Sequence, residues 1–270
     1  MLKTVIAQSA AAPARHAVEV EIAGLAVAVP RHRLAQAEAE ARATRIFPHL
    51  AGHENLFRNT GIETRYTCEP PDWYEREHGW EDRTQSFLAH ALELLEAVAH
   101  AALDEAGIEA RDVSAIVVNT VTGLAIPSLD AKLMNRLGLP NSVERLPLFG
   151  LGCGGGVGGL ARAARYAQAL PGGHVLFLTV DLCSLCLRVN DPSMAMLVST
   201  ALFGDGAAGA VLRAGHRRNG AKPLGRILAV GDHFWRETEH IMGWDVRPDG
   251  FGVVLSAELP QLLRRELLPA

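Results

Sequence analysis

The sequence predicts an α/β protein in which the strands of a sheet are buried between helices. Apolar strand-like runs alternate with helix-like runs through most of the chain. The run 174–182 is apolar at nearly every position, which is typical of a strand that is covered on both faces. Glycines stand where two helix-like runs end, at Gly107 and Gly138. Together these observations favour a layered fold with a central sheet.

The expected elements follow one another in order along the chain. Strands are expected at 18–29, 113–121, 145–151, 174–182, 204–215, 226–238 and 251–256. Helices are expected at 34–46, 86–107, 128–138, 158–170 and 258–267, with a further short helix closing at 199–202. Ser128 is expected to cap its helix. Residues 217–225 form the clearest break.

This break divides the chain into three parts. Residues 1–17 look like a loose, alanine-rich lead-in. Residues 18–225 form one complete α/β half, and residues 226–270 look like the start of a second half that is incomplete. A strand opens each half, which suggests a weak internal symmetry.

Composition excludes several classes of function. The chain has 270 residues, 49% of them hydrophobic, and a formal net charge of -4, so it has no electrostatic footprint for nucleic acid. No stretch reaches the roughly 18 apolar residues that a membrane-spanning helix needs, so no membrane is expected. Four cysteines do not make a disulfide framework and fit a reducing compartment. The cytoplasm is the expected location.

The turn at Cys153 is the most informative segment. A predicted strand runs into Gly152-Cys153-Gly154-Gly155-Gly156, and a predicted helix follows. The start of a helix favours an anion and can lower the pKa of a thiol, and a thiolate attacks thioesters. Cys153 is therefore a candidate nucleophile. A cysteine that merely packs in a glycine-rich turn is an equally weighted alternative.

A third interpretation of this segment is dinucleotide binding. Gly150-x-Gly152-x-x-Gly155 satisfies the glycine pattern of that fold, and Asp181 ends the next strand, where a ribose-binding acid could lie. Several α/β elements precede the pattern, whereas the fingerprint usually opens its domain. This interpretation is the weakest of the three.

Several separated stretches carry a resemblance to a known family. They are Val121-Thr122-Gly123, Gly152-Cys153 with Gly159-Leu160-Ala161, Val175-Leu176 through Asp181, Cys183-Ser184-Leu185, Phe203-Gly204-Asp205-Gly206-Ala207-Ala208, and Met242-Gly243-Trp244. In these stretches the chain resembles the type III polyketide synthases of the chalcone/stilbene synthase family, from about Val18 to about Leu268. The resemblance implies a thiolase-like αβαβα fold, with the first half complete and the second half truncated.

The resemblance also implies a chemistry. A starter acyl group is loaded from a CoA thioester onto the cysteine and is extended by decarboxylative condensation with malonyl-CoA. Acyl-CoA and malonyl-CoA are then substrates, no metal or redox cofactor is needed, and the enzyme is a homodimer.

Residue by residue, the resemblance assigns five positions. Cys153 is the acyl carrier, and Thr122 lines the cavity. Leu187 falls near a phenylalanine that guards the entrance in plant members, so an aliphatic gate is implied. Ile126 falls in the loop that reaches across the dimer interface. Arg58 is a candidate for contacts with the CoA phosphates.

Other polar features receive a different interpretation. Arg65 is, like Arg58, a candidate for contacts with the CoA phosphates. Gly204-Asp205-Gly206 is expected to be architectural, with Asp205 binding backbone N–H groups. The pair in Cys183-Ser184-Leu185-Cys186 is expected to be structural, because no second pair and no fitting histidine accompany it.

The sequence departs from the family pattern in its last part. The family needs a histidine before a Pro-Gly pair and an asparagine in a Gly-Asn-x-Ser-Ser-like stretch. No histidine here precedes Pro-Gly, and no asparagine follows Asn219. His233 and His240 are expected to be strand and loop residues. We therefore expect impaired condensation in this chain.

Two alternatives remain open at this stage. A ketoacyl-carrier-protein synthase III-like enzyme shares the implied fold, the cysteine and a Gly-Asp-Gly-Ala segment, but takes its acyl group from a carrier protein. A catalytically dead chain of the same fold, acting as a dimer partner or surviving as a relic, is the second alternative.

Overall fold

The fold is built on one six-stranded sheet. The computed structural model describes residues 15–48, 52–53, 55–215 and 222–267. The sheet has the strand order β5-β4-β6-β7-β1-β8. Its members are β1 (Arg15–Ala28), β4 (Val113–Thr120), β5 (Glu144–Phe149), β6 (His174–Leu182), β7 (Asp205–Ala214) and β8 (Gly225–Gly231). This arrangement confirms an α/β fold.

Parallel and antiparallel pairs divide the sheet into two parts. β4 pairs in parallel with both β5 and β6. β7 runs antiparallel to both β6 and β1, and β8 runs antiparallel to β1. The carboxyl ends of the parallel strands therefore lie at one edge, where the turns that follow them come together.

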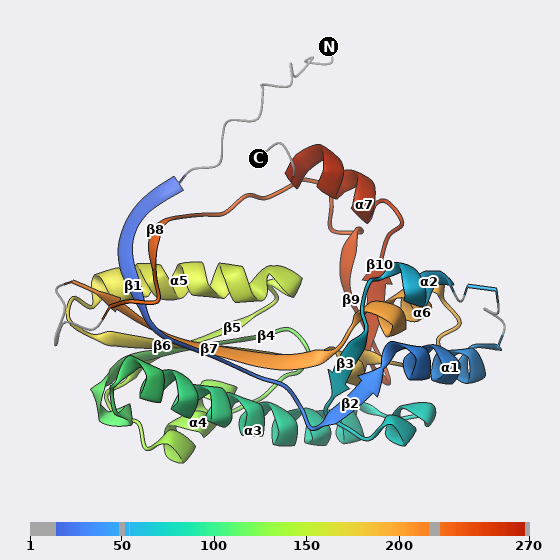
Figure 1. Ribbon diagram of the computed structural model, residues 1–270, viewed down its shortest axis with the longest axis horizontal. Helices are drawn as coiled ribbons and strands as arrows, with labels where there is room; N and C mark the ends of the chain where they lie inside the picture. The colour runs from blue at the N-terminus through green and yellow to red at the C-terminus, as the bar shows by residue number, and fades with distance from the viewer. Residues whose placement is uncertain (1–14, 49–51, 54, 216–221, 268–270) are drawn as a thin grey trace, which may run out of the picture.

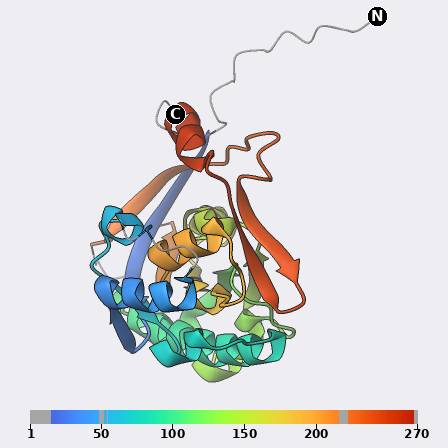
Figure 2. The same cartoon turned by 90° about the vertical axis from the view of Figure 1, so that its right-hand side faces the viewer.

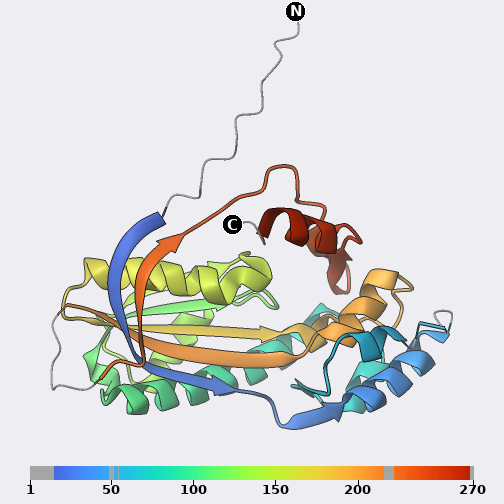
Figure 3. The ribbon, with the colours of Figure 1, turned by 45° about the horizontal axis from the view of Figure 1, so that its top comes forward.

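Helices cover both faces of the sheet. Helix α5 (Gly155–Ala169) lies on one face, and helices α3 (Trp80–Ala106) and α4 (Leu129–Leu137) lie on the other, as Figures 1 and 3 show. The strands carry aliphatic side chains on both faces because both are covered. Two separate core clusters result, one on each side of the sheet.

The long helix α3 packs very closely against the sheet. A Cβ atom added to Gly24 of β1 would lie 2.1 Å from the carbonyl oxygen of Ala102, so only glycine fits there. Among the described residues, α3 is the one helix that is long and apolar enough to cross a membrane, and 56% of its most apolar window is buried inside the protein. Its apolar residues, which include Leu95 and Val98, form the core cluster on this face.

A smaller set of elements gathers beside the sheet edge. It consists of β2 (His32–Ala35), α1 (Gln36–Ile46), α2 (Asn55–Asn59), β3 (Thr64–Thr67), a 3₁₀ turn (Pro71–Glu75), α6 (Met194–Leu202), β9 (Met242–Arg247) and β10 (Gly250–Leu255). β2 pairs with β3, and β9 pairs with β10, both antiparallel. Figure 2 looks onto this side of the molecule. A third hydrophobic cluster joins β2, α1, α2, α6 and the hairpin of β9 and β10.

The hairpin of β9 and β10 is fixed to the main body by two tryptophans. The indole N–H of Trp244 donates to the carbonyl oxygen of Val121 at 2.8 Å, directly after β4. The indole N–H of Trp80, at the start of α3, donates to the carbonyl oxygen of Arg247 at 2.8 Å. Phe251 packs against both rings. The hairpin thus reaches the sheet edge.

Several expected elements differ in the structure. The helix expected at 34–46 starts at Gln36, because the two preceding residues pair with β3. The strand expected at 226–238 ends at Gly231, and the expected helix 258–267 is a single α-helical turn, α7 (Leu259–Leu262), followed by a π-helical turn (Leu263–Leu267). Ser128 occupies the cap position of α4, but its side chain makes no capping hydrogen bond.

The ends of the expected domains also shift. The first strand already includes the backbone of 15–17, which the sequence assigned to the lead-in. Residues 1–14, and residues 217–221 of the expected break, lie outside the described residues. β8 joins the same sheet as the strands of 18–225, so that sheet continues past Arg226 by one strand.

Candidate active site

Cys153 lies on a turn that the sequence forms with glycines. β5 ends at Phe149, and Gly150 and Gly152 follow with φ values of 86° and 61°, a backbone region that strongly favours glycine. A 3₁₀ turn (Gly152–Gly154) then carries Cys153 into α5. Cys153 as a residue is exposed to solvent, although its sulfur is partly shielded from water. The structure therefore rules out the alternative in which this cysteine packs in the interior.

The glycines after Cys153 have two separate roles. A Cβ atom at Gly155 would lie 2.4 Å from the amide nitrogen of Asn119, and one at Gly159 would lie 2.7 Å from the ring of Phe177. These two glycines let α5 approach β4 and β6. Gly154, in contrast, has nothing within 4 Å of an added Cβ atom. The backbone beside Cys153 is thus open on its outer side.

The electrostatic surroundings of Cys153 differ from the expectation. Partial burial of the thiol raises its pKa, and the carboxyl group of Asp181 raises it further. A hydrogen bond from the backbone of Cys153 itself opposes both effects. The expectation that the helix start lowers this pKa is therefore wrong for the chain as described, because loss of hydration and a neighbouring acid outweigh it.

Asp181 lies near the end of β6, beside the turn of Cys153. Its carboxylate accepts hydrogen bonds from the backbone N–H of Val121 at 2.9 Å and from the hydroxyl of Thr120 at 3.4 Å. Burial raises the pKa of this carboxyl group to about 6. The acid thus ties β6 to β4, a role that the dinucleotide interpretation did not include.

Thr122 is buried and ties together the ends of two strands. Its hydroxyl oxygen accepts a hydrogen bond from the backbone N–H of Leu182 at 2.8 Å. On its other side it lines a pocket together with Phe87, Leu185 and Phe251. Thr122 therefore faces a cavity in the structure, but its hydroxyl is already engaged.

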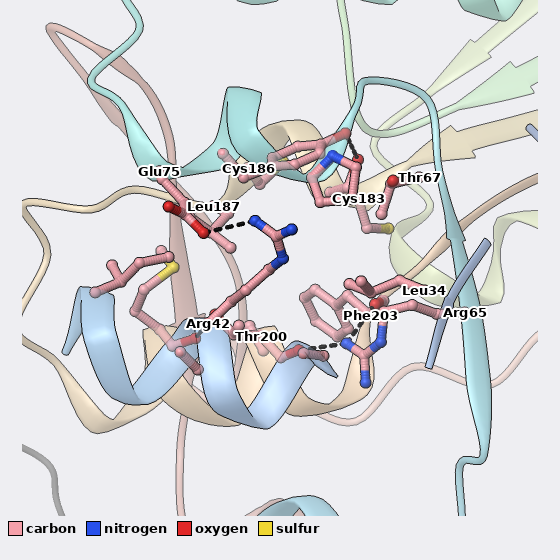
Figure 4. A pocket seen from close by; sticks show the side chains of 18 of the residues that line it. Leu34, Arg42, Arg65, Thr67, Glu75, Cys183, Cys186, Leu187, Thr200 and Phe203 are labelled. Carbon is pink, nitrogen blue, oxygen red and sulfur yellow. Dashed lines mark hydrogen bonds and ion pairs between the residues drawn. The ribbon is translucent and has the colours of Figure 1, made fainter. Parts of the chain in front are cut away.

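Leu187 lines a second and larger pocket. This pocket lies between α1, the turn Pro71–Glu75, α6 and the 3₁₀ turn Cys183–Cys186, and Figure 4 shows it from close by. Leu187 packs against the core cluster on the α3 side of the sheet and also against the third hydrophobic cluster. Phe203 lines the same pocket. Leu187 thus lies in the wall of a pocket, and its implied role as an aliphatic gate at the active-site entrance stays a prediction.

The remaining two predicted positions lie on the surface. Ile126 precedes a cis peptide bond to Pro127, and its side chain is 99% exposed. Arg58 of α2 is also exposed, and its guanidinium lies 3.9 Å from the carboxylate of Glu40. Neither residue lines the pocket of Thr122 or that of Leu187.

Arg65 does not fit the phosphate-binding role that the sequence suggested. It is buried, and its guanidinium donates to the carbonyl oxygens of Ala201 at 2.6 Å and of Phe203 at 2.9 Å. It also donates to the side chain of Gln36. Burial lowers the pKa of Arg65 to about 10. This arginine joins β3 to the end of α6 and is unavailable to CoA.

Asp205 is architectural, as predicted from the glycines on either side of it. Its carboxylate accepts from the backbone N–H groups of Cys68 and Ser184, both at 2.8 Å, and from the hydroxyl of Ser184 at 2.5 Å. The hydroxyl of Tyr74 lies 2.7 Å from that of Ser184. The network joins three segments that are distant in the sequence.

The two cysteines after β6 lie in surroundings that are typical of structural cysteines. Cys186 is buried, and burial raises its pKa to about 12. Burial also raises the pKa of Cys183. Within the described part of the chain, no group of three or more histidine, cysteine or acidic residues could hold a metal ion. His233 and His240 are both exposed and lie outside the strands, so the expectation of a strand position for His233 is wrong.

Sequence reasoning missed the structural roles of two residues, Asp181 and Trp244. Asp181 was considered only as a ribose-binding acid, whereas the structure brings it beside Cys153. Trp244 was part of a motif, but its contact with Val121 depends on a strand, β9, that was not expected. The alternation of large apolar residues at Met242, Trp244 and Val246 was the signal in the sequence that could have indicated this strand.

Comparisons with known proteins agree with this architecture. The family profile of the chalcone and stilbene synthases, N-terminal domain, matches residues 57–216. The 1,3,6,8-tetrahydroxynaphthalene synthase of Streptomyces peucetius is 37% identical over 91% of this chain and 66% of its own length. A putative chalcone synthase of Bacillus subtilis is 32% identical over 91% of this chain and 71% of its own length. The chain thus spans about two thirds of these relatives.

Solved structures give the same result. The tetrahydroxynaphthalene synthase of Streptomyces coelicolor, a bacterial type III polyketide synthase, superposes with a TM-score of 0.84 at 30% identity, covering 91% of this chain and 70% of the other. The polyketide synthase PKS-I of the brown alga Ectocarpus siliculosus superposes with a TM-score of 0.80 at 30% identity, covering 93% and 71%. These neighbours confirm the thiolase-like fold class.

Proposed function

The chain belongs to the chalcone and stilbene synthase family of type III polyketide synthases, and from this premise we propose that it is an acyltransferase in which Cys153 carries the acyl group. The observation that supports this most directly is the solvent-exposed Cys153 on a glycine turn, where β5 delivers it to the start of α5. The role of the residue itself is our proposal.

The proposed first step is a thiol-to-thioester exchange. The Cys153 sulfur, as thiolate, attacks the carbonyl carbon of an acyl-CoA, the bond from that carbon to the CoA sulfur breaks, and CoA leaves as a thiolate that takes up a proton. The open backbone beside Gly154 leaves room for the pantetheine arm. Because the pKa of Cys153 is raised, loading should accelerate as the pH rises.

The proposed second step is decarboxylative condensation with malonyl-CoA, and we expect it to be slow for this polypeptide. The sequence 1–270 holds neither a His-Pro-Gly nor a Gly-Asn segment. Among the described residues, the thiol of Cys153 is stabilised only by its own backbone. Loss of such donors typically reduces a rate by a hundredfold or more for each donor.

We further propose a homodimer in the cytoplasm with CoA thioesters as substrates and no resident metal or redox cofactor. The side chain of Ile126, 99% exposed although apolar, supports a partner at this face. Arg58 is kept as a candidate for a CoA phosphate contact, since it is exposed and the carboxylate of Glu40 lies 3.9 Å from its guanidinium. The reduced thiols suit a reducing compartment.

Mass spectrometry of the intact protein tests the proposal. Incubation with acyl-CoA should add one acyl group, and the Cys153→Ala variant should add none. Peptide mapping should locate the group on Cys153. A chain that never becomes acylated would support the catalytically dead alternative, and rapid formation of polyketide from acyl-CoA and malonyl-CoA would contradict the expected slow condensation.

A further inference from the structure

The turn that carries Cys153 lies above a polar side chain from the middle of the sheet. Asn119 is close to the end of β4, beside Thr179 of β6 in the strand register. Its side chain is on the face of the sheet that α5 covers, and the residue is 0% exposed. Two other β4 residues in the core cluster on this face, Ala115 and Val117, are apolar. Asn119 is therefore a buried amide at the point where the sheet meets the start of α5.

The amide of Asn119 makes one hydrogen bond and leaves its oxygen unpaired. The Nδ2 group donates to the hydroxyl oxygen of Thr179 at 3.1 Å. The Oδ1 atom is buried and has no hydrogen-bond partner among the described residues. A buried acceptor without a partner destabilises the folded state, so an apolar side chain of similar size would suit this interior better. Proteins break this rule mainly at functional sites.

The first turn of α5 lies directly on this amide. A Cβ atom added to Gly155 would lie 2.4 Å from Nδ2 and 2.9 Å from Oδ1 of Asn119. One added to Gly159, a turn further on, would lie 3.5 Å from the Cβ atom of Asn119. The helix backbone reaches the amide because Gly155 has no side chain. Since Gly155 comes two residues after Cys153, the side chain at position 119 sets how far the nucleophile turn stands from the sheet.

The charge at position 119 matters as much as its size. Asp181 already lies beside Cys153, and its carboxyl group raises the pKa of that thiol. A second acid beneath the turn would hold the sulfur still more firmly in the neutral, unreactive form. An amide has the planar shape of a carboxylate but carries no charge. Asparagine therefore supports the turn without opposing the thiolate.

We propose that Asn119 is a positioning residue for Cys153, and that its neutral, planar side chain fixes the first turn of α5 against β4 and thereby the place of the sulfur. This inference deepens the proposed function and rests on it for its consequence in acyl transfer. The first test does not require acylation, so the inference and the proposed function can fail separately.

The pH profile of alkylation tests the charge requirement. Asn119→Asp keeps the size and shape of the side chain but adds a carboxyl group that ionises as the pH rises. With iodoacetamide, Cys153 of the variant should react at the wild-type rate at pH 6 and about tenfold more slowly at pH 8, because an ionised neighbour disfavours the thiolate.

Asn135→Asp is the matched control for the added charge, because Asn135 is exposed on α4, on the other side of the sheet. It should leave the alkylation profile of Cys153 unchanged. A folded Asn119→Asp protein whose profile equals that of the wild type from pH 6 to pH 9 would overturn the inference.

Loading kinetics test the support that the side chain gives. Asn119→Ala removes the amide beneath Gly155 and should reduce the rate of acetyl loading at saturating acetyl-CoA about tenfold, because the sulfur is no longer held in place. The acetyl-CoA concentration that gives half the maximal rate should stay within about twofold of the wild-type value, because Asn119 is fully buried and cannot touch CoA. Intact mass spectrometry over time measures both quantities.

Val117→Ala is the matched control for loss of packing. Val117 is fully buried under the same helix, two residues earlier in β4, so the variant also opens a cavity there. It should lower the melting temperature and leave the loading rate unchanged. If Val117→Ala slows loading as much as Asn119→Ala does, the effect is one of general stability and the inference fails.

The outcomes separate this inference from the proposed function. If Cys153 never takes up an acetyl group while Asn119→Asp still shifts the alkylation profile, the proposed function fails and the positioning role stands. Thr179→Val, which removes only the partner of the amide, serves if Asn119→Ala does not fold, and it should slow loading about threefold. An unchanged loading rate in that variant would count against the inference just as decisively.

Discussion

Two cysteine-bearing turns follow two strands that both pair with β4, and they differ in almost every physical respect. The turn after β5 brings Cys153 to the surface. The turn after β6 carries Cys183 and Cys186 toward the interior, where Asp205 and Ser184 fix the backbone. The comparison teaches that burial and hydrogen bonding, and not the spacing of the cysteines, decide which thiol is available for chemistry.

The largest expected effect concerns the reactivity of the thiols. Iodoacetamide at pH 8 should alkylate Cys153 at least about a hundredfold faster than Cys68 or Cys186. Those two thiols are buried and have pKa values of about 12, so only roughly one in ten thousand is ionised at this pH. Peptide mass spectrometry over time measures the rates.

The Cys153→Ser variant is the control for this alkylation experiment. In this variant the fast alkylation at position 153 should be absent, and the slow alkylation of Cys68 and Cys186 should remain. Equal rates at Cys153 and Cys186 in the folded protein would break the comparison between the two turns.

The next effect concerns the rigidity of the turn after β6. Asp205→Ala removes the acceptor of three hydrogen bonds and leaves the backbone N–H groups of Cys68 and Ser184 buried without a partner. We expect a loss of about 3 to 5 kcal/mol in the free energy of unfolding. Urea denaturation measures it.

Asp104→Ala is the matched control, because Asp104 is exposed on α3. It should change the free energy of unfolding by less than about 0.5 kcal/mol. If Asp205→Ala were equally mild, the network around Asp205 would not be what holds this turn in place.

The smallest expected effect concerns the acid that lies between the two turns. The pKa of Asp181 is raised from 3.8 to about 6, so the folded state binds this proton more tightly than the unfolded state does. The stabilisation is fully present below pH 3.8 and is lost as the pH rises through about 6. At most about 3 kcal/mol is involved.

Asp181→Asn should remove this part of the pH dependence, measured as the free energy of unfolding between pH 4 and pH 7.5. It should also lower the pKa of Cys153 and so speed its alkylation at pH 7.5 a few-fold, because the neighbouring charge is gone. An unchanged pH profile for both quantities would show that Asp181 does not act on Cys153.

Much of the fold could be predicted from local pattern. The run 174–182 coincides with β6, and Gly107 and Gly138 end α3 and α4 with φ values of 65° and 63°. β9 could not be recognised with equal ease, because its side chains are largely exposed and its partner β10 supplies the pairing. A short strand that depends on one neighbour leaves a weak local signal.

The candidate site was predictable in part. The glycine turn of Cys153 is encoded locally, since Gly150 and Gly152 adopt conformations that other residues avoid. The role of Arg65 was not predictable, because its partners are carbonyl oxygens at the end of α6, more than a hundred residues away. A basic residue near a presumed phosphate site looks the same in the sequence whether it is exposed or buried.

The amino-acid sequence alone was enough to predict the family of this protein, most strands of its main sheet, the helices that cover that sheet, and the position of Cys153 between a strand and a helix. Glycine conformations and apolar periodicity act over a few residues, and the sequence therefore displays them directly. The upward shift in the pKa of Cys153, the hydrogen bonds of Thr122 and Arg65, and the apolar pocket that Cys183 lines all depend on the folded structure. Desolvation, charge interactions and cavities arise between segments that are distant in the chain, and no local pattern records them.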